Sequence, residues 1–66
     1  MAITYAPLRK LLAERDISYR QLRADLGIHS RTSKRLKNDS GYVTLETIDL
    51  LCEYLNVPVE RIIKYK

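Results

Sequence analysis

The chain has 66 residues, 45% of them hydrophobic, and its 12 Lys and Arg outnumber eight Asp and Glu to give a formal net charge of +4. This length allows one domain, residues 1–66. The low content of Pro and Gly, two of each, is typical of an ordered globular domain rather than of a disordered tail. One cysteine excludes an internal disulfide, and no apolar run has the length of a membrane span. The N-terminus lacks a signal-peptide pattern, so we expect a cytoplasmic protein without membrane partners.

The two ends of the chain have the composition of short strands. Residues 2–5 (AITY) and residues 62–66 (IIKYK) are rich in β-branched and aromatic side chains, which favour extended structure. The two segments are therefore able to pair as a small terminal sheet.

The first helical pattern follows residue 5. Pro7 suits the first turn of a helix, where its missing N–H is no loss. Leu8, Leu11 and Leu12 then lie on one apolar stripe. Asp16 ends this helix, because Asp tolerates the left-handed conformation of a helix end.

Residues 17–38 contain two short helical patterns joined by one tight turn. Ser18 is expected to cap the first, because Gln21 follows three residues later and completes a capping box. Leu22 lies on the inward face of this helix. Gly27 ends it, since glycine accepts a positive φ without strain.

The second helix of this segment, at about residues 30–38, is unusually basic. Leu36 is its one strong apolar position, and Thr32 and Ser33 share the inward side. Its other faces hold four cations without an acid among them: Arg31, Lys34, Arg35 and Lys37. Residues 17–42 contain six cations against two acids, which equals the whole net charge. Such a cluster repels itself unless a polyanion neutralises it, so the pattern indicates nucleic acid.

A fourth helix follows the polar turn NDSGY at residues 38–42. Thr44 is placed to cap it, and Asn56 to end it. Its predicted core stripe is Leu45, Ile48, Leu51, Cys52 and Leu55, with Cys52 as a buried free thiol. Pro58 then begins a short fifth helix. The predicted fold class is therefore all-α: a compact five-helix domain, to which the chain ends are able to add a small β-pairing.

A helix, a tight turn and a basic second helix are typical of the helix-turn-helix motif that binds DNA. Over roughly residues 5–63 the sequence resembles the Cro/C1-type (Xre-like) helix-turn-helix repressors, the family of the lambda and 434 repressors. The matching residues are Ser18, Gln21, Leu22, Leu26, Gly27, Ile28, Thr32, Leu36 and Asn38, with VTLETI at 43–48 and LNV at 55–57. The resemblance implies a lambda-repressor-like DNA-binding domain with its motif at about 18–38.

The resemblance also implies which residues meet DNA. Base contacts are expected from Ser30, Arg31 and Arg35, with His29 and Lys34 as further candidates. An arginine at such a site can bond O6 and N7 of a guanine. Phosphate contacts are expected from Tyr19, Gln21, Lys37, Asn38 and Tyr42. Arg20 and Arg23 are expected to be peripheral.

Two positions depart from the family pattern. His29 stands where the family usually has a Ser or Thr cap, so the helix start is expected at Ser30. Ser33 replaces a large aliphatic residue and leaves a hydroxyl that needs a partner. We therefore expect Ser33→Leu to fill space and raise stability by on the order of 1 kcal/mol.

Groups for enzyme chemistry do not converge in this sequence. One histidine and one cysteine cannot form a metal cluster, and two glycines cannot form a phosphate-cradling loop. Asp49 and Glu53 share a helix face that is more typical of a solvated surface than of acid–base catalysis. We therefore predict no enzyme activity, metal or cofactor.

The leading interpretation is a sequence-specific transcriptional regulator, a repressor-like protein that binds double-stranded DNA at a pseudo-palindromic operator. We expect a homodimer that uses apolar residues near the C-terminus: Val57, Val59, Ile62 and Tyr65. Two alternatives stay open. One is an antitoxin-like autoregulator bound to a small partner protein, and the other is a protein-interaction module that has kept the same fold.

Overall fold

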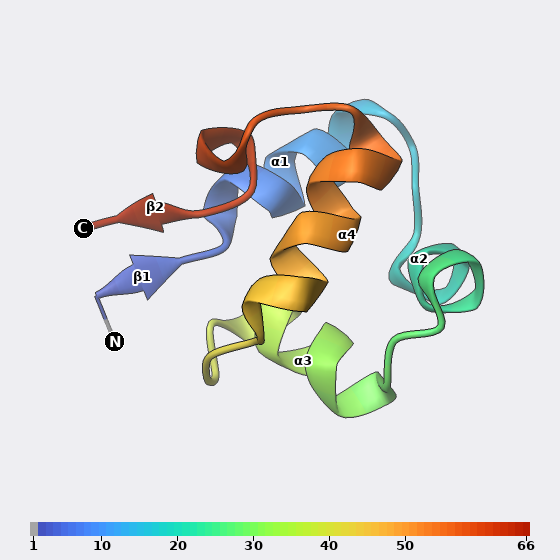
Figure 1. The fold of residues 1–66 in the computed structure, drawn as a ribbon, viewed down its shortest axis with the longest axis horizontal. Coiled ribbons are helices and arrows are strands. Elements are labelled where there is room, and N and C mark those ends of the chain that lie inside the picture. The colour runs from blue at the N-terminus through green and yellow to red at the C-terminus, as the bar shows by residue number, and fades with distance from the viewer. Residues whose placement is uncertain (1) are drawn as a thin grey trace.

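The computed structural model describes residues 2–66 as four α-helices and a two-stranded antiparallel sheet (Figure 1). In chain order the elements are β1 (Ile3–Thr4), α1 (Ala6–Glu14), α2 (Tyr19–Leu26), α3 (Ser30–Asn38), α4 (Leu45–Leu55), the 3-10 turn η1 (Val59–Arg61) and β2 (Lys64–Tyr65). Ile3 pairs with Tyr65 and Thr4 with Lys64, so the terminal sheet predicted from the sequence is confirmed. In residues 2–66, none of the helices is long and apolar enough to cross a membrane.

The short fifth helix that the sequence predicts is not an α-helix, so residues 2–66 hold four α-helices instead of five. Val59–Arg61 form a single 3-10 turn, preceded by an extended Pro58 with φ −73° and ψ 166°. Ile62 directly after this turn is fully buried, and its carbonyl accepts a hydrogen bond from the Leu8 N–H at 3.3 Å. The chain must then extend at once to pair with β1, which leaves no length for a longer helix.

The helix ends follow the local signals in the sequence. The Ser18 hydroxyl accepts the Gln21 N–H at 3.1 Å at the start of α2. Thr44 does the same for the Thr47 N–H at 3.2 Å at the start of α4. Four residues that follow helices have a positive φ: Asp16, Gly27, Asp39 and Asn56. The predicted ends at Asp16, Gly27 and Asn56 are therefore confirmed.

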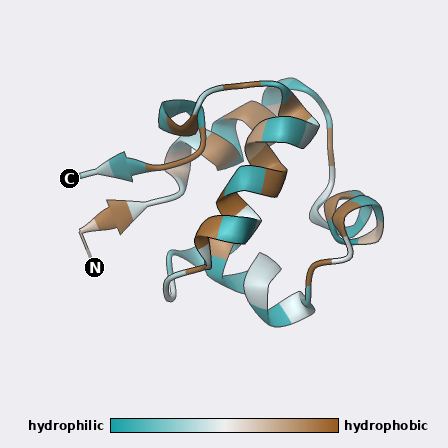
Figure 2. Cartoon of the chain, in the orientation of Figure 1, coloured by the Kyte–Doolittle hydropathy of each residue, from teal (hydrophilic) through white to brown (hydrophobic). Residues whose placement is uncertain are grey.

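The core is mostly aliphatic, and every α-helix contributes to it. Its buried hydrophobic residues are Tyr5, Leu8, Leu11, Leu12, Leu22, Leu36, Ile48, Leu51, Leu55 and Ile62. Figure 2 shows α3 as mostly hydrophilic, and Leu36 is its only hydrophobic residue in this core. The hydrophobic attachment of α3 to the core is therefore narrow and depends on Leu36.

Two predictions about α4 are wrong. Leu45 is 84% exposed, because it is the first residue of the helix and lies one turn before the buried stripe that Ile48, Leu51 and Leu55 form. Cys52 is half-buried, since it lies at the edge of that stripe. Burial still raises the pKa of the Cys52 thiol.

Candidate nucleic-acid interface

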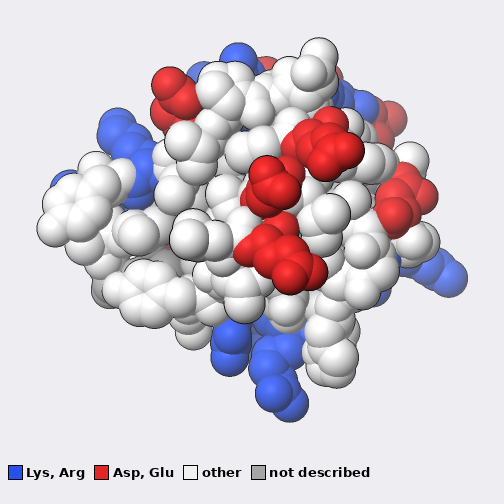
Figure 3. Space-filling view, viewed as in Figure 1, with Lys and Arg blue, Asp and Glu red and all other residues white. Residues whose placement is uncertain are grey.

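The phase of α3 places its cations on the outside of the molecule. Ser33 and Leu36 are buried, whereas Arg31, Lys34 and Lys37 are exposed. In Figure 3, Lys and Arg side chains project from the lower edge of the molecule, where Figure 1 shows α3. Acidic side chains gather instead over α4, on the face turned to the viewer. The basic and acidic surfaces are therefore separate.

The start of α3 is capped by a histidine ring. The helix begins at Ser30, as predicted, and His29 Nδ1 accepts the Arg31 N–H at 3.0 Å. His29 and Ser30 are both exposed, and Nε2 is the ring atom left to meet a ligand.

Ser33 lies inward, as predicted, but its hydroxyl has partners. It donates to the Ser30 carbonyl at 3.3 Å and accepts from Arg23 Nη1 at 3.2 Å. Arg23 therefore connects α2 to α3, because the serine at 33, in place of an aliphatic residue, provides an acceptor for its guanidinium. The peripheral role expected of Arg23 toward DNA stays a prediction.

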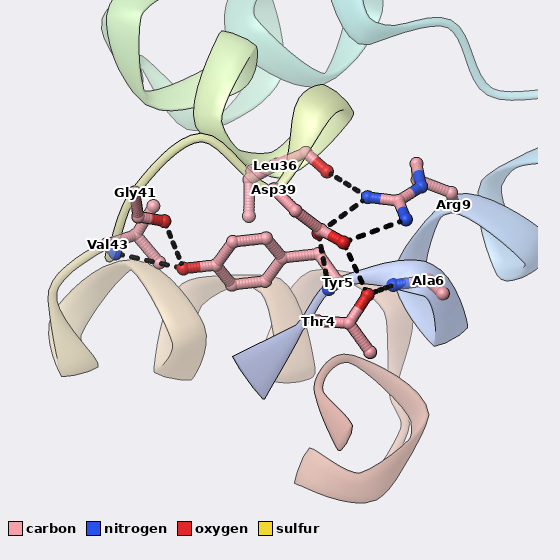
Figure 4. A network of polar contacts seen from close by, with 8 residues as sticks. All are labelled: Thr4, Tyr5, Ala6, Arg9, Leu36, Asp39, Gly41 and Val43. Atoms are coloured by element: carbon pink, nitrogen blue, oxygen red, sulfur yellow. Dashed lines mark hydrogen bonds and ion pairs between the residues drawn. The ribbon is translucent and has the colours of Figure 1, made fainter. Parts of the chain in front are cut away.

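Asp39, directly after α3, accepts hydrogen bonds from the N-terminal segment (Figure 4). Its Oδ1 accepts from the Tyr5 N–H at 2.9 Å and from Arg9 Nη1 at 2.8 Å. Its Oδ2 accepts from Thr4 Oγ1 at 2.6 Å and from Arg9 Nη2 at 3.3 Å. The bonds from Arg9, then from Thr4 and the Tyr5 N–H, hold the pKa of the Asp39 carboxyl well below its usual range. Sequence reasoning missed this cluster; its one signal is an Asp placed at a helix end.

The loop between α3 and α4 is fixed by two side chains. The Tyr5 hydroxyl donates to the Gly41 carbonyl at 2.9 Å and accepts the Val43 N–H at 3.2 Å (Figure 4). Arg35 Nη1 donates to the Tyr42 carbonyl at 3.1 Å. Gly41 allows this approach, because a Cβ there would lie 3.2 Å from Arg35 Cδ. Arg35, a predicted base contact, is therefore half-buried and partly engaged within the chain.

Tyr19 and Lys37 lie together, and both are predicted phosphate contacts. Lys37 Nζ is 6.0 Å from the centroid of the Tyr19 ring, at the limit of a cation–π contact. The Tyr19 hydroxyl, however, is buried without a hydrogen-bond partner, and burial raises its pKa. The hydroxyl is therefore not available at the surface of the free chain, and the phosphate contact expected at Tyr19 stays a prediction.

The remaining predicted residues divide by exposure. Gln21, Lys34, Asn38 and Tyr42 are exposed and free of the core. Of the predicted dimer residues, Val57 is half-buried, while Val59 is 48% and Tyr65 77% exposed. Ile62 is fully buried, so the prediction that it contacts a partner is wrong, because the 3-10 turn directs it into the core.

The α2 and α3 helices, with an inward Leu36 and outward cations, define a helix-turn-helix domain of the DNA-binding class. Residues 7–66 match the family described as the Cro/C1-type HTH DNA-binding domain, and the chain belongs to this family. The resemblance seen in the sequence is thereby confirmed. The chain is also similar to a structure described as "Crystal structure of transcriptional regulator VanUg, Form II", with a TM-score of 0.89 and 32% identity. That match covers 98% of this chain and 85% of the other.

No curated protein matches the chain. The family and the similar structure agree with the geometry of the site: this is a DNA-binding domain of a transcriptional regulator. Among residues 2–66, no three His, Cys, Asp or Glu side chains are grouped so that they could hold a metal ion.

Proposed function

We propose that this protein is a sequence-specific transcriptional regulator that places α3 in the major groove of double-stranded DNA. The observation that carries the proposal is the division of α3 between core and solvent. Ser33 and Leu36 fix its inner face, and its outer face presents Arg31, Lys34 and Lys37. A helix fits the major groove, and cations on its outer face neutralise the phosphates on both sides.

We assign the contacts with DNA bases to the first turn of α3. Ser30 and Arg31 are exposed at its first turn, and His29 precedes them with Nε2 free. Arg31 is the residue with the geometry for a guanine, because a planar guanidinium can donate two parallel hydrogen bonds to O6 and N7. Arg35, held to the Tyr42 carbonyl, has fewer donors left for a base, and Lys34 lies next to it on the outer face.

We assign the contacts with DNA phosphates to the two ends of the motif, the start of α2 and the end of α3. Gln21 is exposed in the first turn of α2, where the helix dipole and the N–H groups that the Ser18 cap leaves free favour an anion. Lys37 and Asn38 are exposed at the end of α3, and Tyr42 is 60% exposed in the loop beyond it. The Tyr19 ring next to Lys37 limits the positions that this lysine samples before DNA arrives.

Two copies on a pseudo-palindromic operator complete the proposed mode of binding. Helix-turn-helix dimers read half-sites about 34 Å apart. The domain measures 28 × 22 × 20 Å, so two copies side by side have the size required to place one α3 in each of two successive major grooves.

Selection of bound sequences from random duplex DNA tests the proposal and identifies the operator. Affinity should then be measured against salt, and log K should fall against log salt with a slope of roughly −4 to −5 per monomer. Lys34→Gln with Lys37→Gln should flatten this slope by about 2. Lys64→Gln with Lys66→Gln removes the same charge away from α3 and should leave the slope unchanged. Random selected sequences together with a flat salt dependence would exclude the proposal.

A further inference from the structure

An open groove lies between the end of α2 and α4. Its lining residues are Leu26, Leu50, Glu53 and Tyr54, and its volume is about 210 Å³. The Tyr54 hydroxyl donates a hydrogen bond to Asp25 Oδ2, which joins α4 to α2 and holds the tyrosine ring at the wall of the groove. Pockets for small molecules occupy about 300–1,000 Å³. The groove is therefore too small for an effector molecule and suits a single side chain of a partner protein.

Leu50 in this groove is an apolar residue that the core does not use. Leu26 packs against the core, whereas Leu50 is half-buried but belongs neither to the core nor to the apolar side chains packed on it. Single exposed leucines are common on protein surfaces. This one, however, shares a groove with Leu26 and Tyr54, so one apolar side chain of a partner would cover all three, and that burial stabilises a complex.

The charges around the groove define the kind of partner. The α4 helix contains Glu46, Asp49 and Glu53 and no Lys or Arg, and Figure 3 shows acidic side chains gathered over it. Asp49 and Glu53 are four residues apart, so their carboxylates repel each other across one turn of the helix. In residues 2–66 neither carboxylate forms a salt bridge. A cation on a partner would relieve this repulsion, whereas a DNA phosphate would add to it.

We propose that this groove is the docking site for a protein segment that presents one large apolar side chain flanked by Lys or Arg. The apolar side chain enters between Leu26, Leu50 and Tyr54, and the flanking cations meet Glu53 and Asp49. The proposal goes beyond DNA binding and does not depend on it, since none of the lining residues belongs to α3. A partner bound here leaves the cations of α3 free, so the chain can hold the partner and DNA together.

Selection of phage-displayed random peptides, with the whole chain as bait, tests the site. The enriched peptides should share a large apolar residue flanked by Lys or Arg. A synthetic peptide of the enriched sequence is then titrated against wild type and variants. Leu50→Gln and Glu53→Gln should each weaken its binding by about tenfold. Leu45→Gln and Glu60→Gln are the matched controls, because both residues are exposed outside the groove, and they should leave the affinity unchanged.

The outcomes are independent of whether the chain binds DNA. Weaker peptide binding in both groove variants, with both controls unchanged, supports the docking site. Thermal unfolding of Leu50→Gln and Glu53→Gln should match wild type, because neither side chain belongs to the core. Enrichment of acidic peptides would place the peptide-binding surface on the basic α3 and overturn the inference, as would equal binding by wild type and both groove variants. A selection that enriches no sequence, or a peptide that duplex DNA displaces, would also overturn it.

Discussion

Arg9 in α1 and Asp39 at the end of α3 form an ion pair, and each also hydrogen-bonds to the end of the helix next to its partner. Arg9 Nη1 lies 2.8 Å from Asp39 Oδ1 and 2.9 Å from the Leu36 carbonyl, one of the carbonyls that α3 leaves free. In return, Asp39 accepts the Tyr5 N–H at the start of α1, where Tyr5 provides no side-chain cap of its own. The orientation of α3 therefore depends on the N-terminal helix as well as on the core.

The first prediction concerns this pair. Asp39→Asn should lower the free energy of unfolding by about 2 kcal/mol at neutral pH, because the charge-assisted bonds to Arg9 are lost. The folded state holds the Asp39 pKa well below its usual range, so the contribution is complete above about pH 4, the ordinary pKa of Asp. It is lost as pH falls further, toward the folded-state pKa. The stability difference between wild type and variant should therefore shrink in acid.

Urea unfolding of both proteins between pH 2.5 and 7 measures this difference. Asp49→Asn is the control, because Asp49 is exposed on α4 and outside the cluster. A difference that stays constant down to pH 2.5 would mean that the carboxylate charge is not what stabilises this contact.

The sequence predicts features that depend on near neighbours. The caps at Ser18 and Thr44 and the end at Gly27 are each determined within about four residues, and the structure confirms them. The Arg9–Asp39 pair joins residues 30 apart, and no local pattern links them. Leu45 shows another limit: hydropathy places it on a helical stripe, but the first residue of a helix need not face the core.

The predicted binding residues divide in the same way. Exposure of Arg31 and Lys37 follows from helical phase alone, once Leu36 is known to point inward. The environment of Tyr19 does not follow from helical phase, because its hydroxyl is buried near a cluster assembled from α1 and the end of α3. The Arg23–Ser33 bond likewise requires the angle between α2 and α3, which the sequence does not provide.

A second prediction tests the buried hydroxyl of Tyr19. Tyr19→Phe removes a polar atom without a partner and keeps the ring next to Lys37, so stability should rise by about 1 kcal/mol and DNA affinity should not change. Tyr5→Phe is the matched control: its hydroxyl makes two hydrogen bonds, and stability should fall. Thermal unfolding and binding of both variants check this. Reduced DNA affinity in Tyr19→Phe would show that the hydroxyl does reach a phosphate.

A third prediction concerns Ser33, whose partners change the expectation drawn from the sequence. Ser33→Leu would remove the acceptor of Arg23 and crowd a position that is only 4% exposed, so stability should fall by about 1 kcal/mol or more. Ser33→Ala and Arg23→Ala, alone and combined, form a double-mutant cycle with an expected coupling of about 0.5–1 kcal/mol. Additive effects, or a stabilised Ser33→Leu, would mean that the hydrogen bond contributes nothing.

The last prediction separates base reading from phosphate contact within α3. Arg31 is exposed at the start of the helix and has a planar fork, so Arg31→Ala should cost about 1–3 kcal/mol and relax preference at one or two base pairs. Lys37 is a point charge near the helix end, so Lys37→Ala should weaken all sequences equally and reduce the salt slope by about 1. Binding of each variant to single-base operator variants at two salt concentrations distinguishes these outcomes. If Arg31→Ala keeps the wild-type base preferences, specificity must come from Ser30 and His29.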